Sequence, residues 1–186
     1  YIIGNSSNVS SYIKSKFKLN VITINPIIYI NKQKKKYNKI LQISWIGRHA
    51  NEKRLFDFVK SIDQVKNQKV KFNIISDKNI KIQIKSFVSK KTFSKIHFYI
   101  YKNNKEFLEK IYSKTDILVS TSMFEGFPNT IAEAVSFNCL IITSKSFGGY
   151  NDIILNNQFG LLFETGNIAE LVKKLKYAII NFNYCK

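Results

Sequence analysis

From about residue 40 to residue 180 the chain alternates between short apolar runs and amphipathic segments. Apolar runs of about four to eight residues are typical of strands buried on both faces, whereas apolar residues spaced three and four apart mark one face of a helix. Strand and helix segments that alternate in this way predict a parallel sheet covered by helices on both faces. We therefore expect an α/β fold of the Rossmann-like type.

The individual segments can be assigned by residue range. Strands are predicted at 40–46, 70–75, 95–100, 116–120, 139–143 and 160–163. Helices are predicted at 52–65, 80–88, 105–112, 129–137 and 168–180. No internal repeat is found, and we expect residues 39–186 to form one Rossmann-like domain.

The first 38 residues have a different character. A predicted helix at 7–17 and a predicted strand at 21–24 precede Asn25-Pro26 and the basic run 32–36. An Asn-Pro step followed by a charged stretch is typical of a connection between domains. We interpret residues 1–38 as the end of an N-terminal domain and an interdomain linker, in which the lysines of the basic run are solvated.

The charge of the chain favours an anionic partner. Its 30 Lys and Arg residues exceed its 12 Asp and Glu residues, which gives a formal net charge of +18. Such a charge suits a phosphate ligand, a nucleic acid or an anionic membrane surface, and does not choose among them. A nucleic-acid-binding module remains an alternative, but without a helix-turn-helix, RNA-recognition or zinc-finger pattern we expect no specific nucleic acid.

The cysteines and the hydropathy of the chain narrow the class of protein further. Cys139 and Cys185 lie far apart and outside any Cys/His cluster, so the sequence predicts neither a disulfide framework nor a metal site. This pattern favours a reducing compartment such as the cytoplasm. The sequence has no apolar run near the roughly 20 residues that span a bilayer.

The segment after the first strand of the main domain carries two cations. In open parallel sheets, ligands bind at the carboxyl ends of the strands. Gly47 is expected to let the backbone turn tightly, while Arg48 offers a forked donor and Lys53 a point charge. We predict that this segment holds a diphosphate. The alternative is that both are ordinary surface cations of a lysine-rich chain.

The segment after the 116–120 strand carries two carboxylates. Glu125 lies in a loop, and Glu133 follows eight positions later in the next helix, so both can share one cleft. A carboxylate accepts hydrogen bonds from both hydroxyls of a diol, which suits one residue to a sugar and the other to a ribose. The helix start at Asn129-Thr130 offers N–H groups to phosphate. Each Glu taken singly could instead be a surface carboxylate near a helix start.

The two histidines and the aromatic residues are assigned structural or passive roles. His49 is expected to be exposed to solvent, and His97 to serve structure within a strand. The aromatic residues are expected to pack in the core and not to form a platform for stacked bases.

In their order along the chain, these motifs resemble the GT-B glycosyltransferases of family 4, over about residues 21–180. The matching motifs are Asn25-Pro26, Gly47-Arg48 with Lys53, the Glu-Gly-Phe-Pro-Asn string from Glu125 with Glu133 after it, Gly148-Gly149, and the Asn-Gln-Phe-Gly segment that ends at Gly160. Three features depart from the family. Residues 75–78 lack its glycine-rich turn and residues 99–102 lack a glycine that is also usual, which leaves the nucleotide base open, and Asp152 stands where a Glu is common.

The resemblance implies the C-terminal, donor-binding half of a retaining enzyme. Such an enzyme would take a sugar from a UDP- or GDP-sugar, without an obligatory metal or cofactor, to a polysaccharide, lipopolysaccharide or glycolipid acceptor. Arg48 and Lys53 would neutralise the diphosphate and the leaving group, Glu125 would hold the sugar and Glu133 the ribose. The implied donor-binding residues are Gly47, Arg48, Lys53, Glu125, Gly126, Phe127, Pro128, Asn129, Thr130 and Glu133, of which Arg48, Lys53 and Glu125 would also act in catalysis.

The acceptor site of this family lies in an N-terminal Rossmann-like domain. We therefore expect the chain to bind donor without transferring sugar unless that domain is present. The parent enzyme is expected to work in the cytoplasm, in peripheral contact with an anionic membrane. A donor-binding domain without activity remains the alternative.

Overall fold

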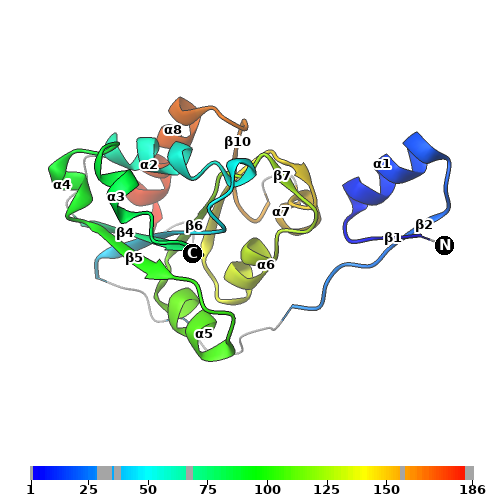
Figure 1. Cartoon of the computed structure of the whole chain (residues 1–186), viewed down its shortest axis with the longest axis horizontal. Helices are drawn as coiled ribbons and strands as arrows, with labels where there is room; N and C mark the ends of the chain where they lie inside the picture. Colours follow the sequence, from blue (N-terminus) through cyan, green and yellow to red (C-terminus); the bar gives the residue numbers. More distant parts are fainter. Residues whose placement is uncertain (1, 29–34, 36–38, 66–68, 156–157, 183–186) are drawn as a thin grey trace.

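The fold is built around a six-stranded parallel sheet, seen in a computed structural model that describes residues 2–28, 35, 39–65, 69–155 and 158–182 (Figure 1). The strand order is β10-β8-β6-β3-β4-β5, and every neighbouring pair is parallel. The strands are β3 (Leu41–Ile46), β4 (Val70–Ser76), β5 (Ile96–Ile100), β6 (Ile117–Ser120), β8 (Leu140–Ser144) and β10 (Leu161–Phe163). The α/β fold predicted from the sequence is confirmed.

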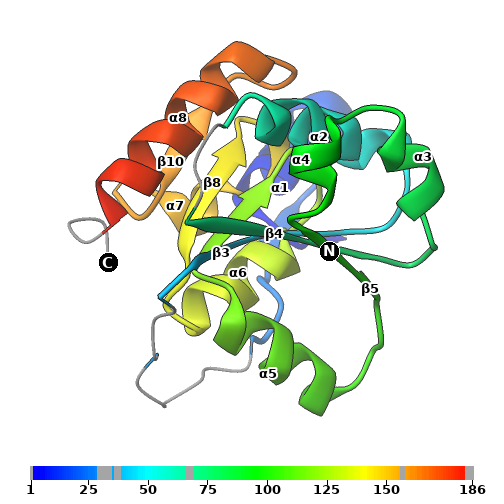
Figure 2. The ribbon, with the colours of Figure 1, turned by 90° about the vertical axis from the view of Figure 1, so that its left-hand side faces the viewer.

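Helices cover both faces of this sheet (Figure 2). One face packs against α2 (Leu55–Asp63), α3 (Lys81–Lys85), α4 (Lys90–Phe93) and α8 (Ile168–Ile180), and the other against α5 (Lys105–Lys114), α6 (Asn129–Ser136) and α7 (Asn151–Ile154). Neighbouring residues of one strand enter opposite cores: Ile74 and Ile142 lie in the first, and Ile75 and Ile141 in the second. Because side chains alternate across a strand, burial on both faces requires the continuous apolar runs of the sequence.

Two predicted helices are interrupted in the structure. The segment predicted as helix 52–65 forms a short 3-10 helix, Asn51–Lys53, and then α2, because Arg54 between them has a left-handed φ of 47°. The segment predicted as helix 80–88 ends early, as α3. A second helix, α4, begins after Ser89, whose side chain accepts a hydrogen bond from the Thr92 backbone N–H. Such capping starts a new helix rather than continuing the old one.

The N-terminal residues form a small βαβ unit. Strand β1 (Ile2–Gly4) pairs in parallel with β2 (Val21–Thr23), and α1 (Ser7–Phe17) connects them. The predicted helix and second strand are confirmed, whereas β1 was not predicted. Ser6 caps α1 by accepting a hydrogen bond from the Val9 N–H, and Lys18 ends the helix in the left-handed region. The placement of a domain boundary near residue 38 stays a prediction.

The basic run 32–36 has one described residue, Lys35. Its ammonium group donates hydrogen bonds to the backbone oxygens of Tyr112, Thr115 and Phe137, at the ends of α5 and α6. Terminal carbonyls of a helix lack partners within the helix, and a cation is favoured there. The prediction of a solvated side chain is therefore wrong for Lys35. The other lysines of the run lie outside the described residues.

Two very short strands bring two loops together at the carboxyl edge of the sheet. Strand β7 (Phe124–Glu125) pairs in parallel with β9 (Phe147–Gly148). Gly148 has a φ of +125°, and a Cβ there would lie 1.4 Å from the backbone oxygen of Glu125. The close approach of the two loops therefore requires glycine at this position. No helix within the described ranges is long and apolar enough to cross a membrane.

Candidate functional site

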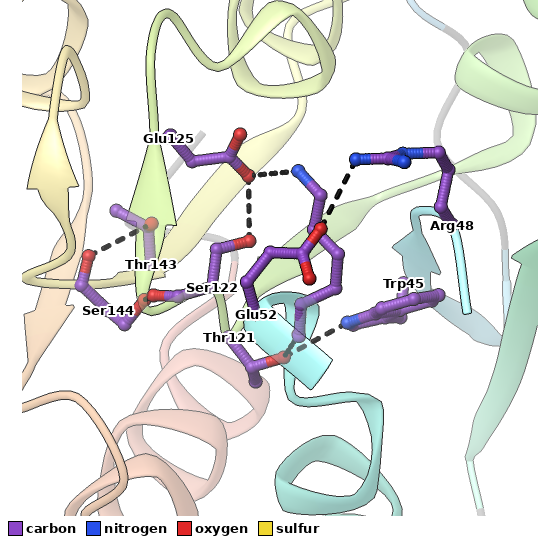
Figure 3. Close-up of polar contacts among 9 residues, drawn as sticks. Trp45, Arg48, Glu52, Thr121, Ser122, Glu125, Thr143 and Ser144 are labelled. Carbon is purple, nitrogen blue, oxygen red and sulfur yellow. Dashed lines mark hydrogen bonds and ion pairs between the residues drawn. The ribbon is translucent and has the colours of Figure 1, made fainter. Parts of the chain in front are cut away.

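Lys53 and Glu125 meet at the carboxyl end of the sheet. Figure 3 shows Glu125 beside Ser122 in this region. Lys53 Nζ lies 2.7 Å from Glu125 Oε1, and the two side chains are only 19% and 11% exposed. The same carboxylate oxygen accepts a 2.7 Å hydrogen bond from Ser122 Oγ. Two of the predicted site residues, from segments far apart in the sequence, thus form one ion pair.

A chain of hydrogen bonds holds the backbone of Lys53 in place. The indole N–H of Trp45, on β3, donates to Thr121 Oγ1 at 3.0 Å, and that hydroxyl donates to the Lys53 backbone oxygen at 2.7 Å. The Met123 N–H also donates to the Glu52 backbone oxygen at 2.7 Å. The loops after β3 and β6 are therefore joined along their backbones, which fixes the point from which the Lys53 side chain projects.

Gly47 has a different role from the one predicted. Its φ does not lie in the left-handed region, so the turn itself does not demand glycine. Instead, a Cβ at this position would lie 2.9 Å from Cη2 of the Trp45 ring. Glycine is needed because the indole occupies the space that a side chain would take.

Arg48 lies beside this pair but is exposed. Its side chain is 71% exposed, and its guanidinium lies 3.2 Å from Glu52 Oε1 in an i,i+4 pair. Exposed pairs of this kind contribute about 0–1 kcal/mol, so little free energy opposes their opening. Arg48 can therefore turn toward an anion that enters beside Lys53.

Glu133 belongs to a separate hydrogen-bond network. Its Oε2 accepts a 2.6 Å hydrogen bond from the hydroxyl of Tyr112, a buried residue of α5. Burial raises the pKa of the Glu133 carboxyl, and the Tyr112 hydrogen bond opposes that rise. Burial and the Glu133 charge raise the pKa of Tyr101, which follows β5. Glu133 thus lies among phenols, whereas Glu125 lies beside an ammonium group.

The start of α6 follows the Glu125 loop directly. Its N-cap position is Pro128, which gives the helix no side-chain cap. Within the described ranges the Thr130 N–H makes no hydrogen bond. Free N–H groups at a helix start, together with the helix dipole, favour an anion. The Gly126 backbone oxygen accepts a 3.1 Å hydrogen bond from the Gly149 N–H, which fixes the entry to this helix.

The two histidines differ from expectation. His49 is half-buried. Its ring meets Phe56 edge-on, with ring centroids 6.2 Å apart, and its backbone N–H donates a hydrogen bond to Asp77 Oδ1 at 2.6 Å. That backbone hydrogen bond lowers the pKa of Asp77. The prediction of an exposed His49 is therefore wrong. His97 lies on β5, as predicted, but its side chain is exposed.

Three residues that contact this site were missed by sequence reasoning. Ser122 and Thr121 follow β6 directly, and their position at the carboxyl end of a strand was the available signal. Tyr112 gave no such signal, because only the packing of α5 beside α6 brings it to Glu133. Among the described residues there is no group of three or more His, Cys, Asp or Glu side chains that could hold a metal ion.

The fold of the chain can be compared with the folds of solved proteins. Its α/β sheet matches solved glycosyltransferases of the GT-B fold. A variant of S. aureus TarM in complex with fondaparinux, α-GlcNAc-glycerol and UDP superposes with a TM-score of 0.84 at 22% identity, over 96% of this chain and 36% of that one. The C-terminal domain of the group 1 protein LpcC from Francisella tularensis superposes with a TM-score of 0.69 at 21% identity, over 80% of this chain and 86% of that one.

The sequence defines the family. The pattern of the family described as glycosyl transferases group 1 matches residues 27–186, and the chain belongs to this family. A relative in Campylobacter jejuni, GalNAc-alpha-(1->4)-GalNAc-alpha-(1->3)-diNAcBac-PP-undecaprenol alpha-1,4-N-acetyl-D-galactosaminyltransferase, is 25% identical over 188 residues, which cover 100% of this chain and 51% of that protein. The lipopolysaccharide 1,6-galactosyltransferase of Escherichia coli K12 is 37% identical over 70 residues, 38% of this chain and 20% of that protein. The chain therefore spans about half the length of the first of these relatives.

Proposed function

We propose that the chain is the C-terminal, donor-binding half of a retaining glycosyltransferase of family 4. The observation that carries the proposal is the Lys53–Glu125 pair, 2.7 Å apart at the carboxyl end of the sheet. A cation and a carboxylate held side by side match the two neighbouring parts of a nucleoside-diphosphate sugar, its diphosphate and its sugar hydroxyls. The donor class is a UDP- or GDP-sugar.

Lys53 and Arg48 are proposed to bind the diphosphate. On donor entry Lys53 exchanges Glu125 for a phosphate oxygen, and Arg48 leaves its exposed partner Glu52 to supply a second charge. The Thr130 N–H at the start of α6 adds a neutral donor. Because two cations stabilise the charge that develops on the leaving diphosphate, we propose that no obligatory metal is needed.

Glu125 and Glu133 are proposed to bind the sugar and the ribose. Once Lys53 has turned to the diphosphate, the Glu125 carboxylate accepts hydrogen bonds from sugar hydroxyls, while Ser122 still fixes one of its oxygens. Glu133 keeps its Tyr112 partner on Oε2, which leaves Oε1 for the ribose. The remaining contacts come from the backbone between Gly126 and Thr130.

The acceptor is proposed to be a glycan or a lipid-linked glycan. One curated relative is named as acting on a diphospho-undecaprenol glycan, and another as a lipopolysaccharide galactosyltransferase. The acceptor is proposed to attack on the face that the diphosphate leaves, so that the anomeric configuration is retained. The rate then depends on positioning and on leaving-group stabilisation.

The other wall of the cleft is proposed to come from an N-terminal Rossmann-like domain. The chain corresponds to about half of its first relative, and it superposes on a structure described as a C-terminal domain. Closure of a second domain would exclude water and bring the acceptor to the sugar. We also propose that the net charge of +18 favours peripheral contact with an anionic membrane at its cytoplasmic face.

Calorimetry with UDP, GDP, UMP and GMP tests the donor site. We expect a diphosphate to bind more tightly than its monophosphate, and we expect the same affinity with Mg²⁺ as with a chelator. Equal affinity for diphosphates and monophosphates would remove the basis for assigning Lys53 and Arg48. Loss of binding in the chelator would show that a metal is required.

Transfer assays separate an enzyme from a binding domain. Radiolabelled UDP- and GDP-sugars are supplied, with a membrane fraction as acceptor, to the chain alone and to a longer form that carries an N-terminal Rossmann-like domain. We expect donor binding by both and transfer only by the longer form. Transfer at equal rates by the chain alone would refute the two-domain proposal, and no transfer by either would favour a donor-binding domain without activity.

A further inference from the structure

The N-terminal βαβ unit contacts the donor-binding loops through one carboxylate. Asp152 lies on α7, just after Gly148-Gly149, and its Oδ2 accepts a 2.8 Å hydrogen bond from the Ser7 N–H. The same oxygen lies 3.2 Å from Asn25 Nδ2 and accepts its hydrogen bond. Asp152 therefore binds the N-terminal unit both at the start of α1 and just after β2.

The contact with Ser7 suits the charge of Asp152. Ser7 is the first residue of the 11-residue helix α1, so its N–H has no partner within the helix. A negative charge at this end is also favoured by the helix dipole. Hydrogen bonds to an ionised acceptor are about twice as strong as neutral ones, which favours this contact over a neutral hydrogen bond such as that of Asn8 to the Gly148 backbone oxygen.

Further contacts surround Asp152. Asn8 Nδ2 donates to the Gly148 backbone oxygen at 2.8 Å, and the ring of Tyr12 meets Phe147 edge-on at 5.6 Å. Phe147 in turn stacks on Phe124, the residue before Glu125, with ring centroids 5.9 Å apart. One face of α1 therefore lies along β9, and β9 pairs with the strand that carries Glu125.

Two glycines allow this close approach. A Cβ at Gly126 would lie 2.7 Å from Nδ2 of Asn5, and a Cβ at Gly149 would lie 2.7 Å from Cβ of Ser6. Both distances are shorter than atoms in contact allow. The terminal amide of Asn5 can turn away from a Cβ at Gly126, whereas a Cβ at Gly149 would displace Ser6 of the N-terminal unit or the Gly126 backbone oxygen, which is 2.9 Å away. Gly126, which the sequence assigned to the donor, thus also makes room for Asn5.

We propose that Asp152 is a positioning residue, which fixes the N-terminal unit against β9 and thereby sets the position of the Glu125 loop. The proposal rests on the donor-binding role of Glu125, and it goes beyond that role because Asp152 is not among the residues proposed to bind the donor. It also gives the Gly148-Gly149 turn a function, which is to join the N-terminal unit to the loop that carries Glu125. Loss of the Asp152 carboxylate should alter the Glu125 loop although that loop is chemically intact.

Backbone amide NMR of the whole chain tests the proposal with Asp152→Ala, Asp152→Asn and Glu109→Ala. Asparagine keeps the shape and one acceptor oxygen but not the charge, and Glu109 is an exposed carboxylate on α5 that serves as the control. We expect Asp152→Ala to speed amide exchange at Ser7 by about tenfold and to shift the Phe124–Gly126 resonances, as loss of one charge-assisted hydrogen bond predicts. Asp152→Asn should give a smaller change and Glu109→Ala none.

Ser7→Pro supplies a second route to the same effect, because it removes the N–H that Asp152 accepts while Asp152 remains, and proline is tolerated at the first position of a helix. The proposal expects the same Phe124–Gly126 shifts in this variant. Faster exchange in α1 without any change at Phe124–Gly126 would overturn it, as would equal effects of Glu109→Ala. UDP affinity should fall in step with the shifts. If the unsubstituted chain binds no UDP, the proposed function fails while the NMR result still decides the role of Asp152.

Discussion

The Tyr112 hydroxyl donates a 2.6 Å hydrogen bond to Glu133 Oε2, so a residue of α5 fixes one oxygen of a carboxylate on α6. Tyr112 cannot move freely, because it is almost fully buried and its ring stacks on Phe137 at 5.6 Å. The orientation of Glu133 is thus set by packing between two helices rather than by solvent. Its Oε1 is then the oxygen proposed to accept the ribose hydroxyls.

Tyr112→Phe should weaken nucleotide binding through Glu133. The variant removes the donor and leaves a half-buried carboxylate oxygen without its partner, at a cost of about 1–2 kcal/mol in unfolding free energy. We expect the preference for UDP over 2′-deoxy-UDP to shrink, because Glu133 is no longer oriented toward the ribose. Calorimetry with both nucleotides measures this preference. Tyr177→Phe, at an exposed position on α8, is the control, and an undiminished preference in Tyr112→Phe would contradict the prediction.

The pH dependence of binding should report the raised pKa of Glu133. Burial disfavours the ionised carboxyl, so the pKa lies above its ordinary value of 4.5. The protonated form therefore adds to the free energy of unfolding. This contribution is fully present below pH 4.5 and is lost as the pH rises through the raised pKa. The affinity for UDP is expected to depend on pH in the opposite direction, because the ribose hydroxyls need the ionised form of Glu133 as acceptor. As the pH falls, UDP affinity should drop at a higher pH than an ordinary Glu would give.

The phosphates of UDP also titrate, which calls for a matched comparison. Calorimetry of the unsubstituted chain and of Glu133→Gln at each pH separates the two effects, since the phosphate contribution is common to both. We expect the ratio of their affinities to approach one at low pH. A ratio that stays constant over the whole range would show that Glu133 does not control binding.

Lys53→Ala should weaken diphosphate binding by about 1.5–3 kcal/mol, the range for hydrogen bonds to charged groups. UMP, which lacks the second phosphate, should be affected less than UDP. Lys105→Ala removes an exposed lysine that also pairs with a Glu, at 3.7 Å, and serves as the control. Calorimetry at one ionic strength gives the six affinities of the unsubstituted chain and the two variants for UDP and UMP. Equal losses in both variants would mean that only the overall charge matters.

Glu125→Gln should separate the diphosphate from the sugar. In the unliganded chain Lys53 forms an ion pair with Glu125. The substitution removes the charge of Glu125 and frees Lys53, so the affinity for UDP should stay equal or increase. The extra affinity of a UDP-sugar over UDP should be smaller in this variant than in the unsubstituted chain, because an amide oxygen is a weaker acceptor for sugar hydroxyls. Calorimetry with UDP, UDP-GlcNAc and UDP-galactose measures this gain. A loss of UDP affinity equal to that of the UDP-sugars would place Glu125 on the diphosphate instead.

The sheet could be predicted from the sequence because its strands are buried on both faces. Such strands require apolar runs, and the runs at 70–75 and 139–143 have no other plausible placement. Strands β7 and β9 could not be predicted, since two residues give no period. The left-handed Arg54 also left no signal, because arginine is not a residue type that favours this conformation.

The candidate site was predictable as a set of residue types and not as a set of contacts. The places of Lys53, Glu125 and Glu133, after strands or in the helix that follows, suggested the chemistry that is proposed for them. Their actual partners depend on tertiary packing: Glu125 meets Lys53 across two loops, and Glu133 meets Tyr112 across two helices. Neither spacing nor composition encodes such distances.

Gly148 limits how the donor preference of this protein can be redesigned. Any side chain there would coincide with the backbone oxygen of Glu125, in a conformation that favours glycine, so no compensating rotamer exists. A mutational library over the donor loops should therefore leave this position constant and vary side chains such as Phe127, Asn129 and Thr130. Tolerance to substitution around the cleft will be sharply uneven, because the wholly intolerant residue packs against the loop that leads to the adaptable ones.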